Sequence, residues 1–97
     1  MNLQITYIKK PVQGKHEHIT HCGNTSARWE LSVADIVYRI EAKIDSFYVQ
    51  DPRTGKVAYV GVVRSSNHAP YLRTYADNTW NDNLLSLPNL SVQDRVY

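Results

Sequence analysis

The stretch from Lys56 to Arg64 constrains the fold most, because it predicts a strand that is apolar on both faces. Side chains of a strand alternate between its two faces. In this stretch Ala58, Val60 and Val62 alternate with Val57, Tyr59, Gly61 and Val63. Such a strand belongs in the middle of a sheet, with neighbours on both edges. Because Gly61 has no side chain to pack, we expect a large neighbouring side chain or a bend at that position.

A single amphipathic helix is predicted from about Ser32 to Lys43. Ser32 is a favourable N-cap, and Asp35 places a carboxylate near the exposed amides of the first turn. Apolar residues then repeat at helical spacing, at Val33, Ile36, Val37, Ile40 and Ile44. One helix covers one face of a sheet, so the other face is left to solvent, to a ligand or to a second subunit.

Four shorter strands are expected around these two elements. They cover residues 3–7, 15–22, 47–50 and 71–75, with a loop at residues 65–70. The order strand, strand, helix and three strands, joined mainly by turns, predicts an α+β fold. We expect a small antiparallel β-meander sheet packed by one amphipathic α-helix. The core is expected to be closed by Leu72, Leu84, Leu85 and Leu87.

The size of the chain predicts one domain. It has 97 residues, of which 42% are hydrophobic and 21% are charged, as in an ordinary globular protein. We expect a single α+β domain at residues 1–88 and a C-terminal tail at residues 89–97. The tail is expected either to be loosely ordered or to form an interface with a partner chain. In the second case the contacts would come from Leu90, Val92, Val96 and Tyr97.

Cysteine usage and hydropathy predict a cytoplasmic location without membrane contact. The single cysteine, Cys22, cannot form an intramolecular disulfide, which fits a reducing compartment. The first residues lack the apolar core of a signal peptide, and no apolar run approaches the ~20 residues of a membrane span. The net charge of +2 permits a phosphate-bearing ligand but makes nucleic acid an unfavoured partner.

The segment from Tyr71 to Pro88 carries a motif. It reads YLRTYAD, two residues, Trp80, one residue and DNLLSLP, and it follows Phe47–Val49 and Val60–Val63. This pattern resembles a small uncharacterised bacterial and phage family of domains of about this length. The resemblance covers residues 1–88 and implies a compact single domain. It implies no activity, cofactor or catalytic residue.

No catalytic residue is expected. Cys22 and His21 are neighbours on an expected strand and point to opposite faces, so they cannot pair simply. Cys22 is expected to be a small core residue. Asp77 and Asp82 are typical of turn carboxylates that cap backbone amides. The sequence therefore predicts a protein that is not an enzyme.

Nor is a metal or cofactor expected. His16 and His18 share a face of the expected strand with Cys22. A zinc site usually needs ligands from a second segment, which only His68 would supply. We therefore expect these histidines to face solvent on the edge of a hairpin.

Aromatic and cationic side chains gather in the segment from Tyr71 to Leu87. Arginine forks match phosphates, flat rings stack on bases, and asparagine amides bind base edges or ribose hydroxyls. The expected ligand-binding residues are Arg64, Arg73, Tyr71, Tyr75, Asp77, Trp80, Asn81, Asn83, Arg28 and Arg53. In an alternative interpretation the tryptophans belong to the core, the tyrosines close the sheet and the asparagines cap turns.

These observations lead to the hypothesis of a non-catalytic binding domain that forms a homo-oligomer and binds a small phosphorylated or nucleotide-like ligand. Arg64 and Arg73 would hold phosphate, while Tyr71, Tyr75 and Trp80 would stack. In a phage, such a protein would sequester a nucleotide signal of host defence, by analogy with phage nucleotide sponges. Two alternatives stay open: a protein-interaction module that inhibits or scaffolds a host complex, and a weak binder of single-stranded nucleic acid through the same face.

Overall fold

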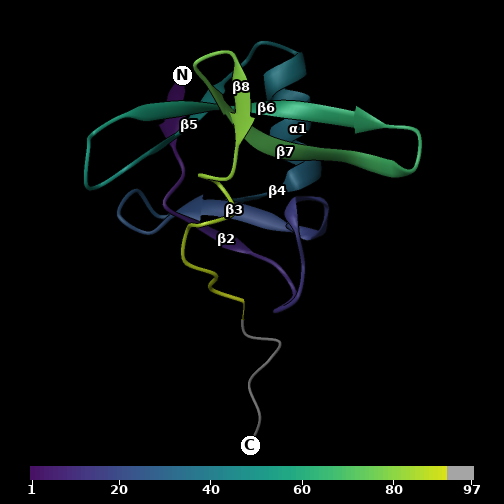
Figure 1. The fold of residues 1–97 in the computed structure, drawn as a ribbon, viewed down its shortest axis with the longest axis horizontal. Coiled ribbons are helices and arrows are strands. Elements are labelled where there is room, and N and C mark those ends of the chain that lie inside the picture. Colours follow the sequence, from purple (N-terminus) through teal and green to yellow (C-terminus); the bar gives the residue numbers. More distant parts are fainter. Residues whose placement is uncertain (92–97) are drawn as a thin grey trace, which may run out of the picture.

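The computed structural model describes residues 1–91, which form two β-sheets, one α-helix and one short 3₁₀-helix (Figure 1). The larger sheet has five strands in the order β1-β5-β6-β7-β8. Their bounds are Asn2–Gln4 (β1), Ser46–Gln50 (β5), Val57–Ser65 (β6), His68–Ala76 (β7) and Thr79–Asn81 (β8). The position of β6 in the centre of this sheet confirms the prediction from its two apolar faces.

A second sheet of three strands corrects the prediction of a single meander. It consists of β2 (Tyr7–Lys9), β3 (His21–Asn24) and β4 (Trp29–Ser32), paired antiparallel. The N–H of Ile5 donates to the carbonyl of Tyr48 in β5, whereas the N–H of Thr6 donates to the carbonyl of Gly23 in β3. The chain thus changes sheet between Ile5 and Thr6. The strand expected at residues 3–7 is therefore two strands, and β1 runs parallel to β5.

The strand expected at residues 15–22 is interrupted by the 3₁₀-helix η1 (His16–His18). The N–H of Lys15 donates to Nδ1 of His18 at 2.9 Å, and the N–H of His18 donates to the Lys15 carbonyl at 2.9 Å. These two bonds close a turn that competes with an extended strand. His16 and His18 therefore share no strand face with Cys22. Cys22 itself is fully buried in β3, which confirms it as a core residue.

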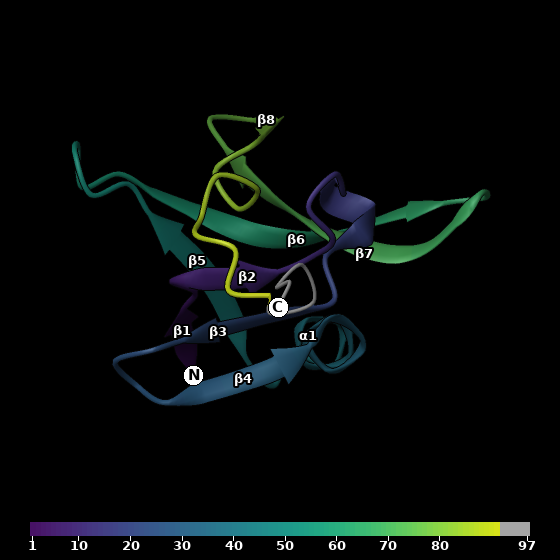
Figure 2. The ribbon, with the colours of Figure 1, turned by 90° about the horizontal axis from the view of Figure 1, so that it is seen from below.

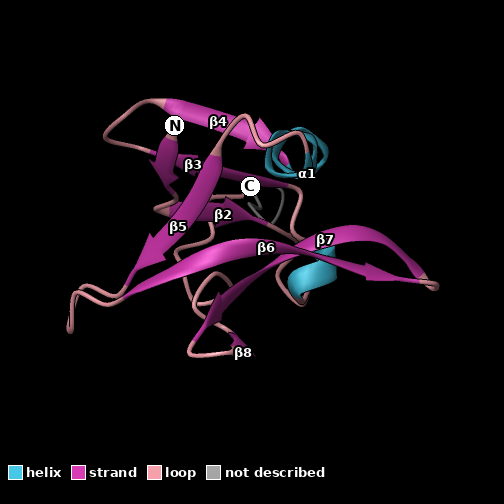
Figure 3. Ribbon diagram, turned by 90° about the horizontal axis from the view of Figure 1, so that it is seen from above, coloured by secondary structure: helices cyan, strands magenta, loops and turns pink. Residues whose placement is uncertain are grey.

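The helix α1 (Val33–Glu41) confirms the predicted helix, which ends two residues earlier than expected. The Ser32 hydroxyl accepts from the N–H of Asp35 at 3.2 Å, as its N-cap role requires. Ile36 and Val37 are buried. The helix and the three-stranded sheet lie on the same side of β6 and β7 (Figure 3). No helix within residues 1–91 is long and apolar enough to cross a membrane.

A hairpin joins β6 and β7 where the sequence predicts a loop at residues 65–70. β6 continues to Ser65 and β7 begins at His68, so only two residues lie between them. Pro70 is tolerated inside β7 because β8 pairs only with residues 74–76. Among residues 1–91, no strand pairs with the other edge of β7 at Pro70, so the missing N–H of proline costs no ladder hydrogen bond there.

One core fills the space between the two sheets and α1. The fully buried side chains include Phe47 of β5, Ile8 of β2, Ile36 of α1 and Leu72 of β7, together with Leu84. Leu85 and Leu87 are among the partly buried side chains that pack against this core. The prediction that the four leucines of the last segment close the core is confirmed.

After Leu87, the chain runs along β2 (Figure 2). The N–H of Ile8 donates to the Pro88 carbonyl at 3.0 Å, and the N–H of Leu90 donates to the Ile8 carbonyl at 2.9 Å. These two hydrogen bonds form a parallel β-bridge between Ile8 and Asn89. Hydrogen bonding thus continues past the predicted domain end at residue 88, and Leu90 contacts its own chain. The other residues expected to form a partner interface lie outside the described residues, namely Val92, Val96 and Tyr97.

Candidate functional site: the outer face of the five-stranded sheet

The side chains of the five-stranded sheet that point away from the core form what we call the outer face. Residues that pair directly across antiparallel strands share a face, about 5 Å apart. Pairing places Tyr48 opposite Tyr59 and Tyr59 opposite Tyr75. Tyr75 in turn lies opposite Trp80. We call these four residues the aromatic row, which crosses β5, β6, β7 and β8.

Much of the aromatic row is exposed to solvent. Tyr59, Tyr75 and Trp80 are 49%, 42% and 42% exposed. The ring centroids of Tyr48 and Tyr59 are 6.1 Å apart, and those of Tyr75 and Trp80 are 5.2 Å apart in an edge-to-face arrangement. Nine large hydrophobic side chains within residues 1–91 are exposed. Four of the nine, Val57 and the three exposed rings of the row, lie on the outer face.

Gly61 allows Trp80 to lie close to the sheet. A Cβ atom at Gly61 would come within 3.0 Å of Cη2 and 3.1 Å of Cζ3 of the Trp80 ring. The indole therefore occupies the space over Gly61, which confirms the expectation of a large side chain there. Gly61 pairs with Arg73, so the indole reaches across β7 to the central strand.

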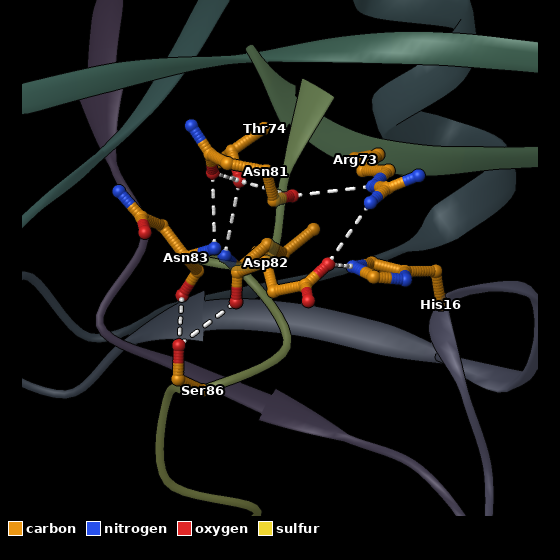
Figure 4. A network of polar contacts seen from close by, with 8 residues as sticks. His16, Arg73, Thr74, Asn81, Asp82, Asn83 and Ser86 are labelled. Atoms are coloured by element: carbon orange, nitrogen blue, oxygen red, sulfur yellow. Dashed lines mark hydrogen bonds and ion pairs between the residues drawn. The ribbon is translucent and has the colours of Figure 1, made fainter. Parts of the chain in front are cut away.

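Arg73 is held by the last residue of β8 and by the residue that follows it (Figure 4). Its Nε donates to the Asn81 carbonyl at 3.2 Å, and its Nη2 donates to Oδ1 of Asp82 at 3.0 Å. Nε2 of the buried His16 lies 3.5 Å from the same carboxylate oxygen, without hydrogen-bond geometry. Burial, followed by the Arg73 charge, lowers the pKa of His16 below its ordinary value. The cation of Arg73 thus already has a carboxylate partner.

Asn81 fixes the backbone after β8 (Figure 4). Its Oδ1 accepts from the hydroxyl of Thr74 and from the N–H of Asn83. The Thr74 hydroxyl also accepts from the N–H of Leu84 at 3.2 Å. These bonds turn the chain so that Leu84 enters the core. Asn81 therefore has the role that the alternative interpretation assigned to the asparagines, the capping of a turn.

The four arginines of the expected ligand site do not converge. Nε of Arg64 donates to Oε2 of Glu41 at 3.1 Å, at the end of α1 and on the core side of the sheet. Arg73 belongs to the outer face, so Arg64 and Arg73 do not come together to hold one phosphate. Arg28 lies in the turn between β3 and β4, with a φ of +62°. Arg53 lies in the turn between β5 and β6, where its side chain is exposed.

Two grooves flank the turn between β5 and β6, and they collect four of the expected ligand residues. A groove of about 310 Å³ is lined in part by Arg53 and Asn83. A second groove of about 450 Å³ is lined in part by Lys56, Asp77, Asn81 and Asn83. The expected ligand residues are therefore divided between these grooves and the outer face, with Arg64 and Arg28 apart from both.

Tyr48 and Tyr59 complete the aromatic row, although neither is among the expected ligand residues. A register argument finds them: antiparallel pairing outward from the turn at residues 51–55 places one opposite the other. Tyr71 lies on the same face and is partly buried. His16 has no comparable signal in the sequence, because its position beside Asp82 depends on η1.

The thiol of Cys22 is expected to be unreactive in the folded protein. Burial raises the pKa of Cys22 to about 12, so the group stays protonated at neutral pH. The thiolate, not the thiol, is the nucleophile and metal ligand. In the part of the chain that the structure describes, no group of three or more His, Cys, Asp or Glu could hold a metal ion.

A comparison with protein families covers nearly the whole chain. A family model described as Protein of unknown function (DUF3892) matches residues 4–88. This match confirms the resemblance to an uncharacterised family. The chain matches no curated protein and no solved structure.

Proposed function

The chain belongs to the DUF3892 family of proteins of unknown function, and we propose that it is a non-catalytic domain that binds another protein through the outer face. The observation that carries this proposal is the gathering of exposed apolar side chains there, with Tyr59, Tyr75 and Trp80 in one row. Contiguous exposed apolar surface marks interaction sites. Tyrosine and tryptophan are also the residues that most often dominate the binding energy of protein interfaces.

The extent of the aromatic row favours a protein partner over a small molecule. Four neighbouring strands at a spacing of about 4.8 Å spread the row over roughly 15 Å. Small-molecule sites are concave and enclose most of the ligand surface. A row of this width on a sheet face suits the apolar centre of a protein interface, where aromatic residues are enriched and charges are depleted.

The charge of the outer face disfavours a nucleic acid. Proteins that stack bases on a sheet also need cations to follow the phosphate backbone. Among the outer-face residues of β6 and β7, Arg73 is the only lysine or arginine. Its guanidinium is already paired with Asp82. A protein surface that is apolar in its centre is therefore the proposed partner.

Site-specific photocrosslinking in cells of the source organism tests this proposal. A benzophenone amino acid at Tyr59 is expected to give a defined adduct with one protein. The same amino acid at Tyr38 is the control, since Tyr38 is 65% exposed but lies on α1, away from the outer face. Binding of the purified adduct partner is then measured for Tyr75→Arg and for the matched control Tyr38→Arg.

Tyr75→Arg is expected to weaken this binding more than tenfold, because loss of an interface anchor costs about 2 kcal/mol or more. Tyr38→Arg should leave it unchanged. The proposal fails if the adduct forms equally from Tyr38, or if Tyr75→Arg binds the partner as tightly as the natural chain. An adduct with nucleic acid in place of protein, with binding that falls steeply with salt, would also overturn it.

A second candidate function is binding of a small phosphorylated or nucleotide-like ligand in the grooves beside the turn between β5 and β6. The observation in its favour is that Arg53, Asp77, Asn81 and Asn83 border these grooves. An exposed arginine fork matches a phosphate, and the amide of Asn83 can bind a base edge or a ribose hydroxyl. In a phage, such binding would remove a nucleotide signal of host defence, an extension that rests on analogy.

Calorimetric titration with cyclic nucleotides and with ADP-ribose-type nucleotides tests the second candidate. Saturable heat that is lost in Arg53→Ala and kept in Arg28→Ala would support it, because both arginines lie in turns but Arg28 lines neither of these two grooves. Absence of heat with every nucleotide would refute it. This result would leave the protein-binding proposal untouched, since the two surfaces are different.

A further inference from the structure

A third hollow lies between η1, the first turns of α1 and the start of β7, where it is lined in part by Tyr71 of the outer face. Its volume is about 430 Å³, within the range of small-molecule sites. The lining combines residues 17–19, residues 33, 34 and 37 of α1, and residues 68–71 of β7. We call it the η1–α1 cleft. With the exception of Tyr71, none of its residues is among the ligand residues expected from the sequence.

The floor of the η1–α1 cleft is apolar and fixed. Ile19 and Val37 belong to the core and are 5% and 9% exposed. Val33 and Pro70, which line the cleft beside them, are partly buried. These four side chains come from three separate segments, namely the residue after η1, the helix α1 and the strand β7. The hollow is therefore built into the fold and does not depend on the shape of a single loop.

The rim carries one charged group. Among residues 1–91, Glu17 is the only Asp, Glu, Lys or Arg that lines the cleft. No ion pair within residues 1–91 engages its carboxylate, in contrast to Glu30, Glu41 and Asp82, each of which has a cationic partner. A hydrogen bond from its own backbone, followed by the influence of nearby His18, His68 and Lys15, keeps the pKa of Glu17 low.

The wall of the cleft also offers aromatic surface. The rings of His68 and Tyr71 meet edge to face, with centroids 6.4 Å apart. A tyrosine ring attracts a cation placed over its face, and an aromatic ligand can pack on it. The cleft thus combines an apolar floor, an aromatic wall and a single negative charge at its mouth.

We propose that the η1–α1 cleft binds a small amphipathic amine. Its ammonium group would pair with the Glu17 carboxylate, and its apolar or aromatic body would lie over Ile19, Val37 and Pro70. The choice of a cation follows from charge complementarity, because the described part of the chain places a carboxylate and no lysine or arginine at the rim. The proposal is independent of the aromatic row and of the grooves beside the turn between β5 and β6, because the cleft shares no residue with them.

An NMR titration of the ¹⁵N-labelled chain tests this inference with three matched probes: phenethylamine, 3-phenylpropionate and 2-phenylethanol. Only the amine is expected to bind at low millimolar concentration, with amide shifts at residues 17–19, 34 and 69. Glu17→Gln should weaken it at least threefold. Asp77→Asn is the control, because Asp77 is another carboxylate without an ion pair within residues 1–91, and it lies in a different hollow.

Ala69→Trp is expected to fill the cleft and abolish the shifts, and Ala34→Phe serves the same purpose if that variant does not fold. Equal binding of the carboxylate or alcohol probe would overturn the proposal, as would full affinity in Glu17→Gln. Shifts confined to the aromatic row would likewise overturn it. Each result is read from the spectrum of the folded chain, whose peak dispersion shows whether the variant is intact.

Discussion

The two faces of the five-stranded sheet are built from the same strands but differ in how deeply their side chains are buried. On the core face, Phe47 and Leu72 are fully buried. Their sequence neighbours Tyr48 and Tyr71 point to the outer face and are only partly buried. Tyr75, also on the outer face, is 42% exposed. Alternation along a strand makes this division possible. The comparison indicates that the core face contributes most of the sheet's share of the folding free energy. Side chains of the outer face can therefore differ in chemical type at little cost in stability.

The largest expected effect follows from breaking the core face at Leu72. Leu72→Ala removes a fully buried side chain and should lower the free energy of unfolding by about 3 kcal/mol. Tyr75→Ala, three residues along the same strand, should cost less than about 1 kcal/mol, because its ring is half exposed. Urea denaturation measures both. Similar losses for the two variants would contradict the division between the faces.

Thr74 should show the next largest effect, although it is polar. Its buried hydroxyl donates to Asn81 and accepts from the N–H of Leu84. Thr74→Val keeps the shape but leaves that N–H without a partner, at a cost of about 2 kcal/mol. Thr79→Val is the control, since Thr79 is exposed. A neutral result in urea denaturation would show that water replaces the lost hydroxyl.

His16, which lies beside Arg73 of the outer face and its partner Asp82, should make the stability of the fold depend on pH. Its pKa is lowered in the folded protein, whereas the unfolded chain takes up a proton near the ordinary value of about 6.5. Between these two pKa values the unfolded state binds more protons, so stability falls as the pH falls below about 7. His16→Gln should therefore lose less stability between pH 7.5 and 5.5 than the natural chain does. Parallel curves for the two proteins in urea denaturation would show that His16 does not contribute.

The smallest expected effect on stability is that of Gly61→Ala. The new methyl group would meet the Trp80 ring at about the limit of contact, and this ring is free to shift because 42% of it is exposed. The displaced Trp80 contact lowers the free energy of unfolding, whereas the greater strand preference of alanine raises it. The two effects should leave the free energy of unfolding within about 1 kcal/mol of the natural value. The indole N–H resonance of Trp80 should move while that of Trp29 stays. An unmoved Trp80 signal would contradict the packing over Gly61.

Local patterns predicted the elements whose signals are short-range. The Ser32 cap, the spacing of Ile36 and Val37, and the two apolar faces of β6 depend on neighbours within a few residues, and all three are confirmed. The large side chain over Gly61 could also be expected, although its identity as Trp80 could not. The α+β class is compatible with the structure, in which strands predominate.

The candidate site was less accessible to sequence reasoning because it depends on long-range pairing. Arg64 and Arg73 look equivalent in the sequence, yet the register of β6 with β7 and the ion pair with Glu41 put them on different sides of the sheet. The change of sheet at Ile5 and the hydrogen bond from Lys15 to His18 also have no signal in the local pattern of apolar residues. The first redirects the chain through backbone groups that every sequence possesses, and the second joins a backbone N–H to a histidine ring nitrogen.

The bridge between Ile8 and residues 88–90 has a consequence for solubility. The backbone of β2 at the edge of the three-stranded sheet would otherwise present unpaired N–H and C=O groups, which invite a strand from another molecule. The carbonyl of Pro88 and the N–H of Leu90 satisfy Ile8 instead. A chain cut after residue 87 would keep its core leucines but expose this edge. Such a chain would be expected to aggregate at concentrations that the longer chain tolerates.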